Sequence, residues 1–172
     1  MTLLSAGIGG VTRAALYKPL AEKDNKTISI VIKTTQAFMR KVSLIFAVAL
    51  IVFAAVYPII INREFEWFFS FTLIIIIGSS TFFANFFGIT YQLLLRADQK
   101  NYIVLLIQSG TVIANTVVAS FLLLNGYSLH IVKLGSALVY TIQPFVMLFY
   151  CKRHYQIDTS VQADSKYIAQ RW

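Results

Sequence analysis

Polar side chains recur at helical spacing inside three long apolar stretches of the sequence. They are spaced by three and four residues, so each set shares one face of a helix. The three sets are Gly78, Thr81, Asn85, Gly88 and Gln92; Gln108, Thr111 and Asn115; and Lys133, Ser136, Tyr140 and Gln143. Amides and hydroxyls are costly in hydrocarbon unless they meet a partner or water.

Two interpretations of these polar faces stay open. For any single residue, a hydrogen bond that joins two helices is favoured, and such bonds contribute about 0.6 kcal/mol each on average. For the three faces together a shared polar cavity is favoured, because five amides are too many to hide from one another cheaply. The five are Asn85, Gln92, Gln108, Asn115 and Gln143.

Two basic residues could bring positive charge to such a cavity. Lys133 could bind an anionic headgroup or a diphosphate. However, it lies only about 6 Å of helical rise from the start of its span, so we favour the interpretation that its side chain snorkels to the outer interface. Arg13 either reaches into the cavity from the inner side or marks the membrane boundary. The predicted cavity residues are Arg13, Thr81, Asn85, Gln92, Gln108, Asn115, Lys133, Tyr140 and Gln143.

Acidic and sulfur side chains are not arranged for catalysis or for metal binding. The seven Asp and Glu residues are scattered outside the apolar stretches, whereas metal-assisted phosphoryl or prenyl transfer needs clustered carboxylates. The single cysteine, Cys151, supports neither a disulfide framework nor a thiolate metal site. We therefore expect no enzymatic activity, no cofactor and no metal.

The elements that must position the polar faces are membrane-spanning helices. The 172 residues are 58% hydrophobic and 13% charged, with a mean hydropathy of +0.70, which does not fit a soluble surface. A helix of about 20 apolar residues crosses a hydrocarbon core of about 30 Å. The sequence predicts an all-α membrane protein with four full spans, at residues 42–61, 67–95 (which includes an amphipathic extension), 102–124 and 129–150.

Basic residues predict the orientation of these spans. Of the 15 Lys and Arg residues, Arg63 lies alone on one side, Lys133 lies inside a span, and the other 13 lie on the opposite side. The positive-inside rule makes that side cytoplasmic. Segments 21–41 and 96–101 and the tail 151–172 are therefore expected to be cytoplasmic. Nucleic-acid binding is not expected, because the cations do not form one folded face with interleaved aromatics.

The first 41 residues differ from the spans that follow. Residues 1–20 give too short a helix to cross the membrane, and Pro19 is expected to end it. Ala6, Gly10 and Ala14 are spaced by four, which permits close approach to another helix. Residues 21–41 form a basic amphipathic segment, expected to lie along the inner surface before it turns into the first span.

Three stretches of the sequence carry a family resemblance. They are "GIGGVTRAALYKPLAEKD" at 7–24, "ITYQLLLRADQKNYI" at 89–103 and the closing "AQRW". Together they resemble the Wzx-like polysaccharide and teichoic-acid flippases of the multidrug/oligosaccharidyl-lipid/polysaccharide superfamily. The resemblance extends over essentially the whole chain.

The resemblance implies a fold and an activity. The family has about a dozen helices in two pseudo-symmetric bundles in an inverted V, around a cavity that opens to each side alternately. The chain would be an N-terminal-half fragment: the end of a truncated helix, four full helices of one bundle, and a tail leading to a missing second bundle. The parent would move undecaprenyl-diphosphate-linked oligosaccharide, for O-antigen or teichoic acid, across the bacterial inner membrane. Its partners would be that lipid-linked sugar, membrane lipid and the rest of the transporter.

Other functions stay open from the sequence. A drug or small-amphiphile exporter of the same superfamily would be expected to have aromatic and acidic cavity walls. The predicted spans contain no Asp or Glu, which argues against this function. A non-transporting membrane scaffold or a pseudogene fragment is the alternative from a different class.

Overall fold

The computed structural model describes residues 2–61 and 67–157, and these residues are helical apart from short turns. The helices are α1 (Thr2–Glu22), α2 (Asn25–Ile61), α3 (Trp67–Phe83), the π-helical turn η1 (Ala84–Gly88), α4 (Ile89–Ala97), α5 (Asn101–Leu124) and α6 (Leu129–His154). Four stretches are long and apolar enough to cross a membrane: Asn25–Tyr57, Trp67–Ala97, Asn101–Leu124 and Leu129–His154. The expected all-α class is confirmed, and the four candidate spans suggest a multi-pass membrane protein.

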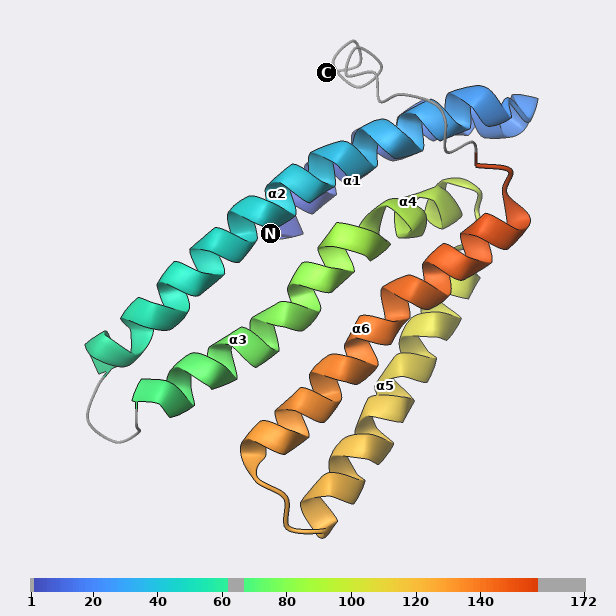
Figure 1. Ribbon diagram of the computed structural model, residues 1–172. Coiled ribbons are helices and arrows are strands. Elements are labelled where there is room, and N and C mark those ends of the chain that lie inside the picture. The colour runs from blue at the N-terminus through green and yellow to red at the C-terminus, as the bar shows by residue number, and fades with distance from the viewer. Residues whose placement is uncertain (1, 62–66, 158–172) are drawn as a thin grey trace.

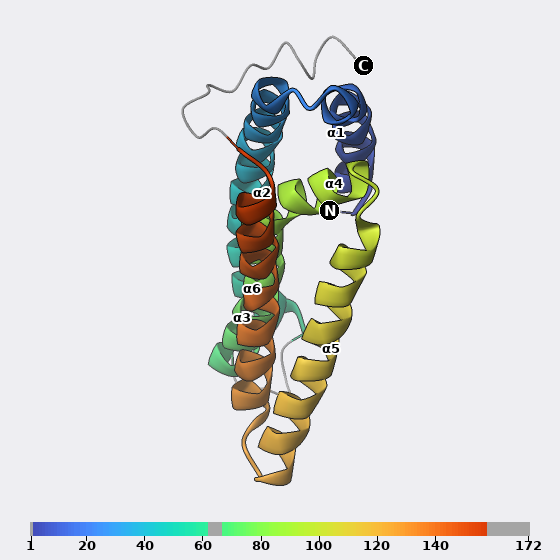
Figure 2. The same cartoon turned by 90° about the vertical axis from the view of Figure 1, so that its right-hand side faces the viewer.

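The four long stretches lie side by side in the order α2, α3, α6, α5 (Figure 1). Helices α1 and α5 lie on the same side of the layer formed by α2, α3 and α6, and α4 crosses toward α1 (Figure 2). The α1–α2 turn, the α4–α5 turn and the end of α6 meet at one end of the bundle, which we call the inner end. The described cations of the connecting turns lie at this end. Arg63 and residues 158–172 lie outside the described residues.

Buried apolar side chains gather at the inner end and form what we call the hub. Each of five helices contributes to it: Leu16, Ile32, Leu94, Val104 and Met147 belong to α1, α2, α4, α5 and α6, and all are at most 2% exposed. The long stretches instead leave many large apolar side chains exposed, as expected of helices solvated by lipid. The hub therefore holds the inner end together by ordinary core packing.

Helix α2 runs unbroken through the predicted boundary between the amphipathic segment and the first span. We expected the chain to turn near residue 41, but one helix covers 25–61. No Gly or Pro interrupts residues 25–57. Ile28, Val31 and Ile32 are buried in the hub, so their packing keeps the first part of α2 on the same axis as the rest of the helix. Arg40 consequently lies about 22 Å along the helix from its start.

Helix α1 is also longer than expected. Pro19 does not end it, and the helix continues to Glu22. The proline removes one hydrogen bond to the Ala15 carbonyl, but its ring is buried and its own carbonyl accepts a hydrogen bond from the Asp24 amide at 2.9 Å. The turn is completed by Lys23 in the left-handed conformation, with φ 55°.

Asp24 caps the start of α2. Its Oδ1 accepts hydrogen bonds from the Lys26 and Thr27 amides, each at 3.1 Å, and its Oδ2 accepts one from the Thr27 hydroxyl. The Thr27 side chain is the largest cause of the lowered pKa of Asp24, followed by the Thr27 amide. Amides at a helix start have no partner within the helix, so this carboxylate satisfies two of them.

We predict that Asp24→Ala frays the first turn of α2. Hydrogen exchange of the Lys26 and Thr27 amides should accelerate, because both lose their acceptor. Because the pKa of Asp24 is lowered on folding, the cap is complete above its ordinary value of 3.8 and is lost as pH falls through the lower folded value. Asp24→Asn is the control: it keeps an acceptor and should lose this acid dependence. Unchanged exchange in Asp24→Ala would show that the cap does not hold the turn.

Candidate functional site

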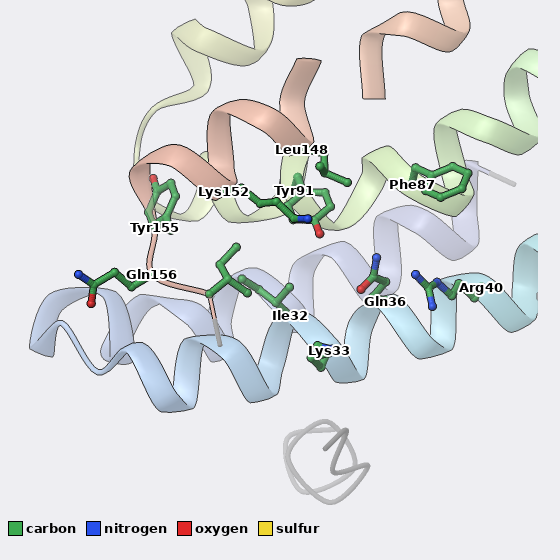
Figure 3. A pocket seen from close by; sticks show the side chains of 11 residues that line it. Ile32, Lys33, Gln36, Arg40, Phe87, Tyr91, Leu148, Lys152, Tyr155 and Gln156 are labelled. Atoms are coloured by element: carbon green, nitrogen blue, oxygen red, sulfur yellow. The ribbon is translucent and has the colours of Figure 1, made fainter. Parts of the chain in front are cut away.

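A cavity of about 530 Å³ lies at the inner end between α2 and α6 (Figure 3). Within the described residues these two helices do not pack directly on each other, and η1 and α4 form the floor between them. The cavity is lined by Ile32, Lys33, Gln36 and Arg40 of α2, Phe87 and Tyr91 of η1 and α4, Leu148 and Lys152 of α6, and Tyr155, Gln156 and Ile157.

The lining of the cavity is positively charged. Among the described residues, the lining includes the cations Lys33, Arg40 and Lys152 and no Asp or Glu. The Arg40 guanidinium also lies 5.3 Å from the centroid of the Phe86 ring in η1, a cation–π distance. Phe87 and Tyr91 add aromatic surface next to these charges. This combination suits an anionic ligand that also presents an apolar or ring surface.

The end wall of the cavity is held by a small polar cluster. The Tyr155 hydroxyl donates a hydrogen bond to Asp98 Oδ2, and Lys100 Nζ lies 2.7 Å from the same oxygen and 3.3 Å from the Tyr155 hydroxyl. Burial and then the bond to Asp98 raise the pKa of Tyr155, so this hydroxyl remains a donor at neutral pH. The bond to Asp98 likewise raises the pKa of Lys100. The cluster ties the α4–α5 turn to the end of α6.

None of the nine predicted cavity residues lines this cavity. Thr81 of α3 is exposed, and the Asn85 side chain of η1 donates a hydrogen bond to the Thr81 carbonyl. Gly78 and Gly88, the two glycines of the predicted polar face, lie where neighbouring helices approach closely. A Cβ on Gly78 would lie 2.2 Å from Leu50 of α2, and a Cβ on Gly88 would lie 2.8 Å from Pro144 of α6. These glycines therefore serve packing.

The other predicted residues are also spread over the bundle. Gln92, Gln108, Asn115, Tyr140 and Gln143 are half-buried, Lys133 is exposed, and Arg13 is half-buried with its Nε donating to the Gly9 carbonyl of its own helix. Asn115 Oδ1 is buried without a hydrogen-bond partner among the described residues. The structure does not bring the nine around the described cavity, so the groove that they were expected to share stays a prediction.

On α1, Gly9 and not the predicted Gly10 makes a close approach to a neighbouring helix, and the side chain of Ala6 lies outside the described residues. A Cβ added to Gly10 would meet nothing within 4 Å, whereas one on Gly9 would lie 3.1 Å from Leu93 of α4. Thr12 of α1 and Thr35 of α2 are both fully buried and their hydroxyls are 3.3 Å apart. This pair joins two helices in the way expected of the polar faces of the spans.

No family model, curated protein or solved structure matches this chain. The family resemblance of the three sequence stretches therefore stays a prediction. Any functional proposal has to be supported by the chemistry of the site.

In the sequence, Lys33 and Arg40 helped to predict the orientation and the basic amphipathic segment, and Lys152 helped to predict the orientation alone. Lys33, Gln36 and Arg40 are spaced by three and four residues, so they share a face of α2. This spacing could have indicated a binding site on this segment. Nothing in the local sequence could have indicated Lys152, because its position opposite α2 depends on how α6 packs.

Proposed function

We propose that this chain is part of a flippase that moves a polyprenyl-diphosphate-linked oligosaccharide across a bacterial inner membrane. The observation that carries the proposal is the cavity at the inner end, where residues 2–61 and 67–157 contribute three cations and no acid to the lining. Four candidate spans, the gathering of basic turns at that end and the resemblance to Wzx-like flippases support it.

The cavity suits the diphosphate part of such a substrate. The guanidinium of Arg40 can bind phosphate oxygens in a bidentate manner, and Lys33 and Lys152 supply two further charges. A volume of about 530 Å³ is that of a small-ligand pocket. We propose that it holds the diphosphate and the adjoining sugar, with Phe87 and Tyr91 beside the sugar ring. The rest of the oligosaccharide lies outside, and the polyprenyl tail stays in the lipid.

The proposed activity is a movement and requires no covalent chemistry. A carrier of this kind opens its site first to one side of the membrane and then to the other. The basic cavity would receive the anionic headgroup at the cytoplasmic leaflet, where the negative surface potential makes a cationic site effective. The polar residues of the spans, from Thr81 to Gln143, would then bind the sugars along the path.

Deletion of the gene tests this function. We predict that lipid-linked oligosaccharide accumulates in the cytoplasmic leaflet and that surface polysaccharide is lost, because synthesis continues without translocation. Leaflet position is measured by enzymatic labelling of the sugar in intact spheroplasts and in inverted vesicles, and expression of the gene should restore it. An unchanged distribution of the precursor would overturn the proposal, and a changed drug sensitivity alone would favour the exporter alternative.

A further inference from the structure

A cluster of phenylalanine side chains begins at the end of the cavity that is farther from the inner end of the bundle. Phe87 lines the cavity and lies near Arg40, at the opposite end from Tyr155 (Figure 3). The centroid of the Phe87 ring lies 4.7 Å from that of Phe86 in η1 and 5.4 Å from that of Phe145 in α6. We call Phe82, Phe83, Phe86, Phe87 and Phe145 the phenylalanine cluster.

The phenylalanine cluster continues from the cavity to the end of α3 through successive ring contacts. The centroid of Phe86 lies 5.4 Å from that of Phe82, and the centroid of Phe87 lies 6.2 Å from that of Phe83, with these two rings nearly parallel. These four side chains are half-buried, and Phe145 is 45% exposed. The described part of the protein therefore leaves aromatic surface uncovered beside the cations of the cavity, as in a site that binds an apolar group.

The π-helical turn η1 places the phenylalanine cluster between α2 and α6. Its consecutive residues Phe86 and Phe87 contact different helices, because Phe86 lies under the Arg40 guanidinium of α2 and Phe87 lies against Phe145 of α6. Within the described residues α2 and α6 do not pack on each other, so they do not close over the rings between them. Turns of this kind occur frequently at functional sites.

Arg40 lies at the boundary between the charged and the aromatic surfaces. Its guanidinium is 5.3 Å from the centroid of the Phe86 ring and also lines the cavity with Lys33 and Lys152. Arg40 belongs to the candidate span Asn25–Tyr57. A ligand that has its anion among these three cations, and an apolar chain attached to that anion, would therefore place the start of its chain on the phenylalanine cluster.

We propose that the phenylalanine cluster binds the isoprenoid chain of a prenyl diphosphate whose headgroup occupies the cavity. This inference rests on the proposed function and adds that the part of the tail next to the diphosphate contacts the protein before the rest enters the lipid. Each isoprene unit contains a flat, methyl-branched double bond, which can stack on phenylalanine rings more closely than a flexible saturated chain. Hydrocarbon gives apolar surfaces no hydrophobic drive to associate, so this packing is the source of the chain preference.

Binding of three probes to the full chain in mild detergent tests this inference. The probes are geranylgeranyl diphosphate, hexadecyl diphosphate and inorganic diphosphate, and isothermal titration calorimetry measures their affinities. We expect the parent to bind geranylgeranyl diphosphate about tenfold more tightly than hexadecyl diphosphate. Both chains partition into detergent, so their comparison removes that contribution. The double variant Phe82→Leu, Phe145→Leu should reduce this ratio to about twofold or less, because leucine keeps the apolar character and has no ring.

The headgroup site provides the first control. Phe82 and Phe145 do not line the cavity, so the double variant should bind inorganic diphosphate as the parent does. The matched variant Phe68→Leu, Phe121→Leu replaces two phenylalanines of α3 and α5 that are 70% and 64% exposed and lie outside the cluster. It should keep the preference for the isoprenoid chain, and circular dichroism should show equal helicity in all variants.

Two results would overturn the inference: equal affinities of the parent for the two chains, or the same loss of preference in both double variants. Either would mean that any lipid chain, including the acyl chain of a phospholipid, serves equally well. The titration involves no translocation. A chain preference combined with an unchanged precursor distribution after gene deletion would support this inference and overturn the flippase, and the opposite pair of results would do the reverse.

Discussion

Replacement of Lys33, Arg40 and Lys152 together by glutamine is expected to abolish translocation and to weaken diphosphate binding by at least about 10³-fold. Each charge-assisted hydrogen bond to a phosphate contributes about 1.5–3 kcal/mol, and 1.4 kcal/mol corresponds to a factor of ten. The three side chains line one cavity, so the variant removes every cation that the described part of the chain contributes to its lining. Binding is measured with a soluble polyprenyl-diphosphate analogue, and translocation by leaflet labelling of the precursor.

A second set of cations provides the matched control. Lys18, Lys23 and Lys26 are exposed at the same end of the bundle but do not line the cavity. Their replacement by glutamine removes the same net charge and should leave diphosphate affinity within a few-fold of the parent. An equal loss of binding in both variants would mean that general charge attraction is responsible. Full binding in the cavity variant would place the headgroup elsewhere.

Gly88→Ala is expected to destabilise the protein by about 1–3 kcal/mol, the usual effect of an extra methyl group in a packed contact. The added Cβ would lie 2.8 Å from Pro144 Cβ and 3.3 Å from Pro144 Cα. The second of these atoms is backbone in α6, so no side-chain rotation relieves the clash. The helix containing η1 must then move away from α6. Thermal unfolding in detergent, followed by circular dichroism, measures the change.

Gly110→Ala is the control for this substitution. Gly110 lies in α5, and a Cβ there would meet nothing within 4 Å. Since alanine is the better helix former by about 1 kcal/mol, this variant should be as stable as the parent or slightly more so. Equal stabilities for the two alanine variants would show that α6 adapts to the larger residue, and the tight contact would then not be a determinant of the fold.

Hydropathy and charge were enough to predict the spans, because each depends on the local composition of the chain. Lipid requires long apolar helices whatever their neighbours are. The same local information could not show that α2 continues straight through Lys41, since Ile28, Val31 and Ile32 are buried in a cluster with residues of other helices, and α2 packs on α1 and α4.

The predicted polar face of the second span was divided by a feature that periodicity does not reveal. The π-helical turn η1 interrupts the α-helix at Ala84–Gly88, and one extra residue rotates all later side chains by about 100°. Thr81 and Gln92 therefore do not share the face that their spacing indicated. The cavity escaped prediction for a related reason: Arg40 and Lys152 are far apart in sequence and meet only through the packing of α2 and α6 across η1 and α4.

The unbroken course of α2 connects the cavity mechanically to the bilayer. Lys33 and Arg40 belong to the same 37-residue helix as the exposed apolar side chains Ile51 and Phe53 of the candidate span. Long apolar helices adjust their tilt to the thickness of the hydrocarbon layer. A thinner or thicker membrane that changes the inclination of this helix must also displace one wall of the cavity, so anion affinity should vary with acyl-chain length in reconstituted bilayers.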